Sequence, residues 1–102
     1  MNTVFSVDDI VYIDHESKNL KMYMADGNFF PEDITYYRVK LMLNENFVRI
    51  NKTVIVNLLY VSRIDRNCII LINDEHFEIE IEYEKEVTNR FYKIKLENFM
   101  SE

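Results

Sequence analysis

The dominant feature of this sequence is an alternation of apolar and polar residues with a period of two. It is strictest in residues 77–84, where apolar side chains alternate with four glutamates. Successive side chains of a β-strand point to opposite faces of a sheet, so this spacing is typical of strands with one buried face. Short alternating segments recur along the chain between polar turns. They predict about eight short strands and a mainly β domain with minor helix.

The clearest strands lie near the N-terminus. Residues 10–15 alternate as a largely buried strand, and residues 20–25 as a half-buried one. The polar stretch 14–19 between them is predicted to be a hairpin loop. A second turn is predicted at 26–28, where Gly27 is the one glycine of the chain and can take positive φ freely.

The first predicted helix follows a short strand that contains Phe29 and Phe30 and is expected to end at Pro31. Proline fits the first turn of a helix, and acidic residues favour the positive end of the helix dipole. With Ile34, Tyr37 and Leu41 at helical spacing, we expect an amphipathic helix over residues 32–43.

The second half of the chain is predicted to hold more strands and a second helix. Residues 53–56 suit a strand, with a brief helical turn as the alternative, and two further strands are expected over 58–64 and 68–72. The alternation over residues 77–84 predicts a strand that begins at Phe77 and stops before Tyr83. Residues 82–95 are also compatible with a helix whose inward face holds Val87, Phe91, Ile94 and, as a further candidate, Tyr83.

Length and composition favour one domain. The chain has 102 residues, of which 48% are apolar, enough for one packed core, so we expect a single domain over 1–102. No apolar stretch approaches the roughly 20 residues of a membrane helix, and the first ten residues do not resemble a secretory signal. The single Cys68 excludes a disulfide framework. A cytoplasmic protein without membrane insertion is therefore expected.

The sequence gives no sign of catalytic chemistry. His15, His76 and Cys68 are not at metal-ligand spacing, and Cys68 lies in an apolar run typical of a core residue. One glycine makes a phosphate-binding loop implausible. We therefore expect no catalytic residues, no metal, no cofactor and no small-molecule substrate, and the chain is not predicted to be an enzyme.

Charge is unevenly distributed. The net charge is −6, but residues 38–66 hold six basic residues against two acidic ones, while 74–86 hold seven acidic residues and one lysine. An acidic chain would normally count against nucleic-acid binding. The basic segment keeps it open, because attraction to phosphate acts over roughly 8–10 Å at physiological salt. The alternative is that both signs are only solubilising surface.

A resemblance to a known family rests on residues 47–58, FVRINKTVIVNL, followed by VSRI at 61–64. This segment resembles the hallmark of LytTR-type DNA-binding domains, in which F-x-R-[ILVC]-[HN]-[RKN]-[ST]-x-x-V-N precedes an isoleucine-containing strand. The opening DIVYID of residues 9–14 is similar to the first strand of that family. The order of turns, strands and helices agrees over 7–96, and the resemblance implies that these residues form the core of the domain.

The resemblance implies a fold of small stacked β-sheets with two short helices. Members of the family are bacterial transcription regulators that read the major groove of double-stranded DNA through loops, often in pairs on direct repeats. They usually follow a receiver domain. No residues remain for one here, so the resemblance implies a stand-alone or excised domain.

The family's contact positions can be carried over residue by residue. They fall first on Arg49, Asn51, Lys52 and Thr53, side chains able to bind phosphates or base edges. The alternatives are a structural ion pair for Arg49 and a turn-stabilising role for Asn51. Asn57 matches a nearly fixed asparagine and is expected to bind backbone groups in a turn. A second contact region falls on Lys18, Asn19 and Lys21.

The third contact region departs from the family pattern, because acidic residues occupy 80–84 where basic and hydroxyl side chains usually enter the last helix. Lys85 and Arg90 are the candidates to replace them. The expected function is therefore sequence-specific DNA binding in transcription regulation. The alternative is a protein-interaction module with lost or weakened DNA binding that modulates a related regulator. The oligomeric state is left open by the sequence, with a homodimer and a pair with such a regulator as the two candidates.

Overall fold

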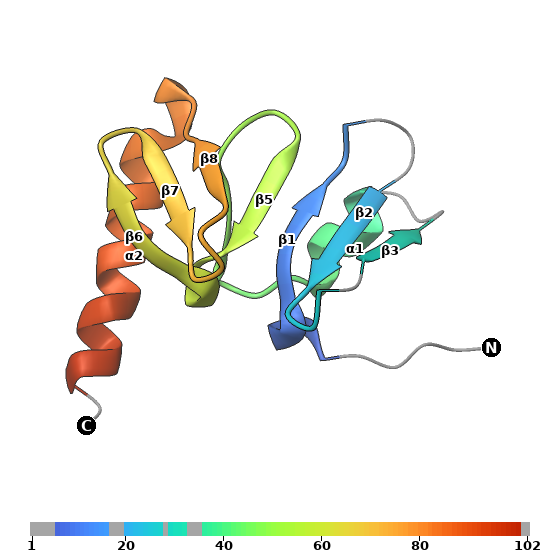
Figure 1. Ribbon diagram of the computed structural model, residues 1–102, viewed down its shortest axis with the longest axis horizontal. Helices are drawn as coiled ribbons and strands as arrows, with labels where there is room; N and C mark the ends of the chain where they lie inside the picture. The colour runs from blue at the N-terminus through green and yellow to red at the C-terminus, as the bar shows by residue number, and fades with distance from the viewer. Residues whose placement is uncertain (1–5, 17–19, 28, 33–35, 101–102) are drawn as a thin grey trace.

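The computed structural model describes residues 6–16, 20–27, 29–32 and 36–100, and they form two antiparallel β-sheets with two α-helices (Figure 1). The expectation of a mainly β fold with stacked sheets is confirmed. The sheets pack against each other through one shared hydrophobic core.

The larger sheet has the strand order β3-β2-β1-β5-β4. Its central strand β1 pairs with β2 on one side and β5 on the other, and Asp14 at its end lies opposite both Lys21 and Val54. Its strands are β1 (Ile10–Asp14), β2 (Leu20–Met24), β3 (Phe29–Glu32), β4 (Phe47–Arg49) and β5 (Val54–Asn57).

The smaller sheet has the order β6-β7-β8. It consists of β6 (Val61–Asp65), β7 (Cys68–Leu71) and β8 (His76–Glu78). The helices are α1 (Tyr36–Met42), α2 (Ile81–Met100) and the short 3-10 turns η1 (Val7–Asp9) and η2 (Leu58–Tyr60).

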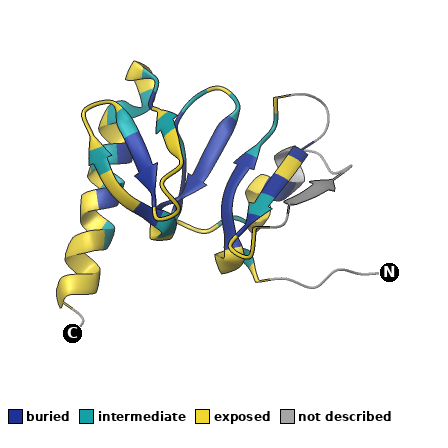
Figure 2. Ribbon diagram, viewed as in Figure 1, coloured by how far each residue is buried: buried dark blue, intermediate teal, exposed yellow. Residues whose placement is uncertain are grey.

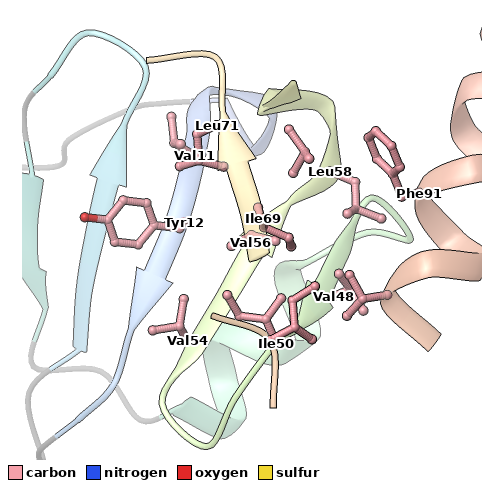
Figure 3. Packing of buried hydrophobic residues seen from close by; sticks show 13 residues of the cluster. Val11, Tyr12, Val48, Ile50, Val54, Val56, Leu58, Ile69, Leu71 and Phe91 are labelled. Atoms are coloured by element: carbon pink, nitrogen blue, oxygen red, sulfur yellow. The ribbon is translucent and has the colours of Figure 1, made fainter. Parts of the chain in front are cut away.

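Two hydrophobic clusters cover the two faces of the larger sheet. Val39 of α1 packs with Ile13 of β1 and Ile55 of β5 on one face. On the other face, side chains of β1, β4 and β5 pack against the smaller sheet and α2 (Figure 3). Most residues of β1, β5 and β7 are buried, whereas the second half of α2 extends past the sheets and is exposed (Figure 2).

A β-bulge interrupts the alternation of β1. The register shifts between Ile10 and Tyr12, so Val11 is the extra residue. Val11 and Tyr12 therefore both join the core between the sheets, while Ile10 and Ile13 face α1. A bulge changes the direction of the side chains that follow it, and strict period-two spacing could not predict this.

Asn57 has the structural role expected of it. Its side chain is fully buried; Nδ2 donates to the carbonyl of Ile10 (2.9 Å), and Oδ1 accepts from the backbone N–H of Leu59 (3.0 Å). The second bond caps η2. The strand expected over 58–64 therefore begins only at Val61, after a 3-10 turn.

The prediction around the first helix is wrong in two respects. Pro31 does not end the strand but lies within β3, opposite Lys21, and Glu32 belongs to the same strand. Proline is tolerated there because β3 is an edge strand. The helix predicted over 32–43 is α1, which spans Tyr36–Met42; residues 33–35 lie outside the described residues. Leu41 is 74% exposed, and Val39 is the buried contact instead.

The predicted strand over 77–84 is also wrong beyond its first residues. Strand β8 ends at Glu78, and α2 begins at Ile81. The helix is favoured because Val87 and Phe91, four residues apart, are both buried in the core. Tyr83 and Ile94 pack beside them, so the predicted inward face is confirmed. With 20 residues, α2 is longer than expected.

Candidate nucleic-acid interface

The loop between β4 and β5, residues 50–53, is held in shape by its own side chains. Asn51 Oδ1 accepts hydrogen bonds from the backbone N–H groups of Thr53 (2.8 Å) and Val54 (2.8 Å) and from Thr53 Oγ1 (3.2 Å). This is the turn-stabilising role typical of asparagine. Lys52 is exposed, whereas its neighbours Asn51 and Thr53 are half-buried. The loop thus presents a lysine on a fixed backbone.

Arg49, at the end of β4, also holds the backbone of this loop. Its Nη1 donates to the carbonyls of Asn51 (3.2 Å) and Lys52 (2.9 Å) and lies 2.9 Å from Nε2 of His15. Arg49 is half-buried. The guanidinium therefore organises the loop backbone. Its side chain also meets the ring of His15.

His15 joins this loop to the end of β1. Its backbone N–H donates to the carbonyl of Thr53 (2.9 Å), and its ring meets Arg49. Since a guanidinium offers only donors, Nε2 of His15 must accept, which requires a neutral ring. Burial and the positive charge of Arg49 both lower the pKa of His15. The ring is therefore held neutral and in one tautomer.

Glu80 lies against the other side of the loop. Its Oε1 accepts from the backbone N–H of Lys52 (2.9 Å), and its own N–H donates to the carbonyl of Ile50 (2.9 Å). Glu80 is half-buried and precedes α2 directly. This acidic residue is therefore part of the loop's support. The four glutamates of 77–84 do not form one strand face, since Glu82 and Glu84 lie in the first turn of α2.

The second predicted region is only partly described. Lys21 is exposed on β2 and lies opposite Asp14, which in turn lies opposite Val54. With neighbouring strands about 4.8 Å apart, Lys21 lies roughly 10 Å from β5, at the end of the sheet that carries the loop. Lys18 and Asn19 lie outside the described residues.

The two candidates on α2, Lys85 and Arg90, differ from Lys52 because the contacts described for them do not involve the β4–β5 loop. Arg90 Nη1 donates to the carbonyl of Phe47 (2.8 Å), and its Nε lies 3.9 Å from Glu86. This half-buried arginine ties α2 to the start of β4, away from Lys52. Lys85 is exposed and, two residues before the buried Val87, lies on the opposite side of the helix.

Arg66 was not singled out by the sequence, yet it lies at the same end of the molecule. Asn67 beside it accepts from the N–H of Ile79 (2.6 Å), which precedes the loop-binding Glu80. The β6–β7 turn, the start of α2 and the β4–β5 loop form one edge (upper edge in Figure 1). Arg66 is exposed there with φ 58°. The turn was predictable, but its neighbours were not, because they depend on packing between the sheets.

The described residues include no group of three or more His, Cys, Asp or Glu side chains placed to hold a metal ion. Within the same residues, no helix has the length and apolar character needed to cross a membrane.

The two packed antiparallel sheets and the long helix α2 place the chain in the class of small, mainly β domains. The family model of the LytTr DNA-binding domain matches residues 2–93, and the chain belongs to this family. That model describes a DNA-binding domain rather than a catalytic one. A similar solved structure is the LytTr DNA-binding domain of a protein from Bacillus cereus described as a methyl-accepting/DNA response regulator. It has a TM-score of 0.71 and 13% identity, covering 84% of each chain. No curated protein matches by sequence.

Proposed function

We propose that this chain is a sequence-specific transcription regulator of bacterial cytoplasm that reads the major groove of double-stranded DNA through its loops. The observation that carries the proposal is the β4–β5 loop, whose backbone is bound by Arg49, Asn51 and Glu80 while Lys52 remains exposed. A fixed loop loses little conformational entropy on binding. The membership of a DNA-binding family supports the same function.

Within the proposal, the predicted contact residues have different roles. Lys52 and Thr53 contact base edges or phosphates, and Lys21 contacts a phosphate together with the neighbouring Lys18 and Asn19. Arg49 and Asn51 position the loop. Lys85 and Arg66 supply further phosphate contacts at the flanks, whereas Arg90 serves mainly to hold α2 on β4.

The experiment is selection of bound duplexes from a randomised pool with the full chain, followed by affinity measurement on the enriched sequence. We expect one motif to be enriched. Lys52→Ala should weaken binding by about 1–3 kcal/mol if Lys52 reads a base, and by less if it contacts only phosphate. The matched control is Lys93→Ala, which removes an exposed lysine from α2 and should change affinity little.

Background affinity for every duplex at low ionic strength, with folded protein, would contradict the proposal. That result would leave the interaction-module alternative standing. We further propose that two copies occupy one DNA site, because the described part of each chain presents one such edge. Light scattering of the complex should then give two chains per selected duplex.

A further inference from the structure

A cavity of about 410 Å³ lies at the end of the sheets opposite the β4–β5 loop. Its walls come from the β1 bulge, the turn after β2, η2 and the turn between β7 and β8. Its size falls within the range of sites that hold small molecules. The far end of β1 carries the DNA-binding candidates, so this cavity is distinct from the proposed interface.

Three tyrosines give the cavity an aromatic wall. Tyr12 and Tyr23 stack with ring centroids 4.3 Å apart, and Tyr60 is the third. Phe77 meets Tyr12 edge to face at 4.8 Å and fixes its ring from behind. Tyr12 extends over β2, with its hydroxyl directed away from the rest of the core (Figure 3).

The polar groups of the cavity are acidic. Glu75 is held in place by two neutral donors, Tyr12 Oη to its Oε2 (3.3 Å) and Asn73 Nδ2 to its Oε1 (2.7 Å). Neither donor cancels its negative charge. Asp26 lines the same cavity, and no Lys, Arg or His is found among the described residues that line it.

The surrounding charges have the same sign. Tyr60 Oη donates to the backbone carbonyl of Asp8 (2.9 Å). Burial and the carboxylates of Asp9 and Asp8 raise the pKa of Tyr60. Burial and Glu75 likewise raise the pKa of Tyr12, so both hydroxyls stay protonated at neutral pH. The cavity therefore has a negative potential and would repel an anion.

We propose that this cavity binds a small organic cation of the quaternary-ammonium or alkylamine type, held by the rings of Tyr23 and Tyr60 and by the carboxylate of Glu75. Aromatic rings attract cations through their electron-rich faces, and a cluster of rings is a recurrent site for quaternary ammonium groups. The carboxylate of Glu75, which has neutral hydrogen-bond donors, adds attraction for the positive charge. The proposal does not depend on DNA binding.

The test is an NMR titration of the full chain, without DNA and at constant ionic strength, with choline as the probe. Two probes of similar shape complete the set: the neutral carbon isostere dimethylbutanol and the anion pivalate. We expect saturable shifts from choline at the amides of Ala25, Gly27 and Ile72, with a roughly millimolar or lower Kd. Dimethylbutanol should bind more weakly than choline, and pivalate should not bind.

Two variants test the proposed contacts. Tyr23→Leu should weaken choline binding about 2- to 30-fold by removing a ring, whereas Tyr92→Leu on exposed α2 should not. Glu75→Gln should weaken it about fivefold or more, and Glu97→Gln on α2 is its matched control. Glu75 lies in an exposed turn, so this variant remains informative if Tyr23→Leu does not fold.

Three results would overturn the proposal: no saturable choline shifts at the cavity, equal affinity for dimethylbutanol or pivalate, or unchanged choline affinity in Glu75→Gln. None of these would bear on DNA binding, which is measured with other variants at the other end of β1.

Discussion

At the scale of single residues, Asn57 illustrates how one side chain fixes the junction between the two sheets. It satisfies the carbonyl of Ile10 and the N–H of Leu59 from a fully buried position. Asn57→Ala should reduce the free energy of unfolding by about 1–3 kcal/mol for each buried group left without a partner. Urea denaturation measures this loss. Asn89→Ala, at an exposed site of α2, should change the value little; equal stability of the two variants would contradict the assigned role.

His15 makes stability depend on pH. Its pKa is lowered in the folded protein by burial and by Arg49. As pH falls below about 6.5, the unfolded chain protonates first and binds more protons, so the free energy of unfolding should decrease. His15→Gln, which keeps an acceptor for Arg49 but does not titrate, should flatten the dependence between pH about 7.5 and about 5.5.

The control for this effect is the second histidine. His76→Gln makes the same substitution at an exposed position of β8, and urea denaturation of the parent chain and both variants is measured over the same pH range. Equal slopes for His15→Gln and the parent chain would show that the Arg49 contact does not hold His15 neutral.

At the scale of elements, α2 is attached to the sheets by its first half only. Phe91 is 4% exposed, whereas Phe99 is 78% exposed. Phe91→Ala should therefore cost about 3–5 kcal/mol in the free energy of unfolding, and Phe91→Leu less than about 1.5 kcal/mol. Phe99→Ala should cost less than about 0.5 kcal/mol. Thermal or urea unfolding of the three variants gives the order, and a comparable loss in Phe99→Ala would contradict this attachment.

The strands also show which elements could be predicted from sequence patterns and which could not. Alternation located β1 and β2, and the continuous apolar run at 68–72 located β7, because each strand has a partner sheet or helix on its apolar face. It failed at 77–84, where Ile79 and Ile81 keep the strand period although Ile79 alone is buried. Propensity could not place Pro31 in a strand, since its tolerance depends on an edge position that only the assembled sheet defines.

The candidate interface was predictable in its location but not in its internal roles. Residues 49–53 were identified from their resemblance to a family motif. The roles of Arg49 and Lys52 depend on His15 and Glu80, which are 34 and 28 residues away in sequence. Such contacts arise from the packing of β1 and α2 beside the loop, and no local pattern encodes them.

At the scale of the whole molecule, a net charge of −6 must be reconciled with binding a polyanion. The exposed cations described at the proposed edge are Lys21, Lys52 and Arg66, with acidic residues between them. Each phosphate neutralised contributes about −0.9 to the slope of log affinity against log salt. The slope should therefore be shallow, about −2.7 for these three cations and about −3.6 if Lys85 at the flank also contacts a phosphate. A salt titration on the selected duplex measures it, and Arg66→Ala should reduce its magnitude by about one. A slope much steeper than this would mean that DNA contacts a different and more basic face, and an unchanged slope in Arg66→Ala would place the β6–β7 turn outside the interface.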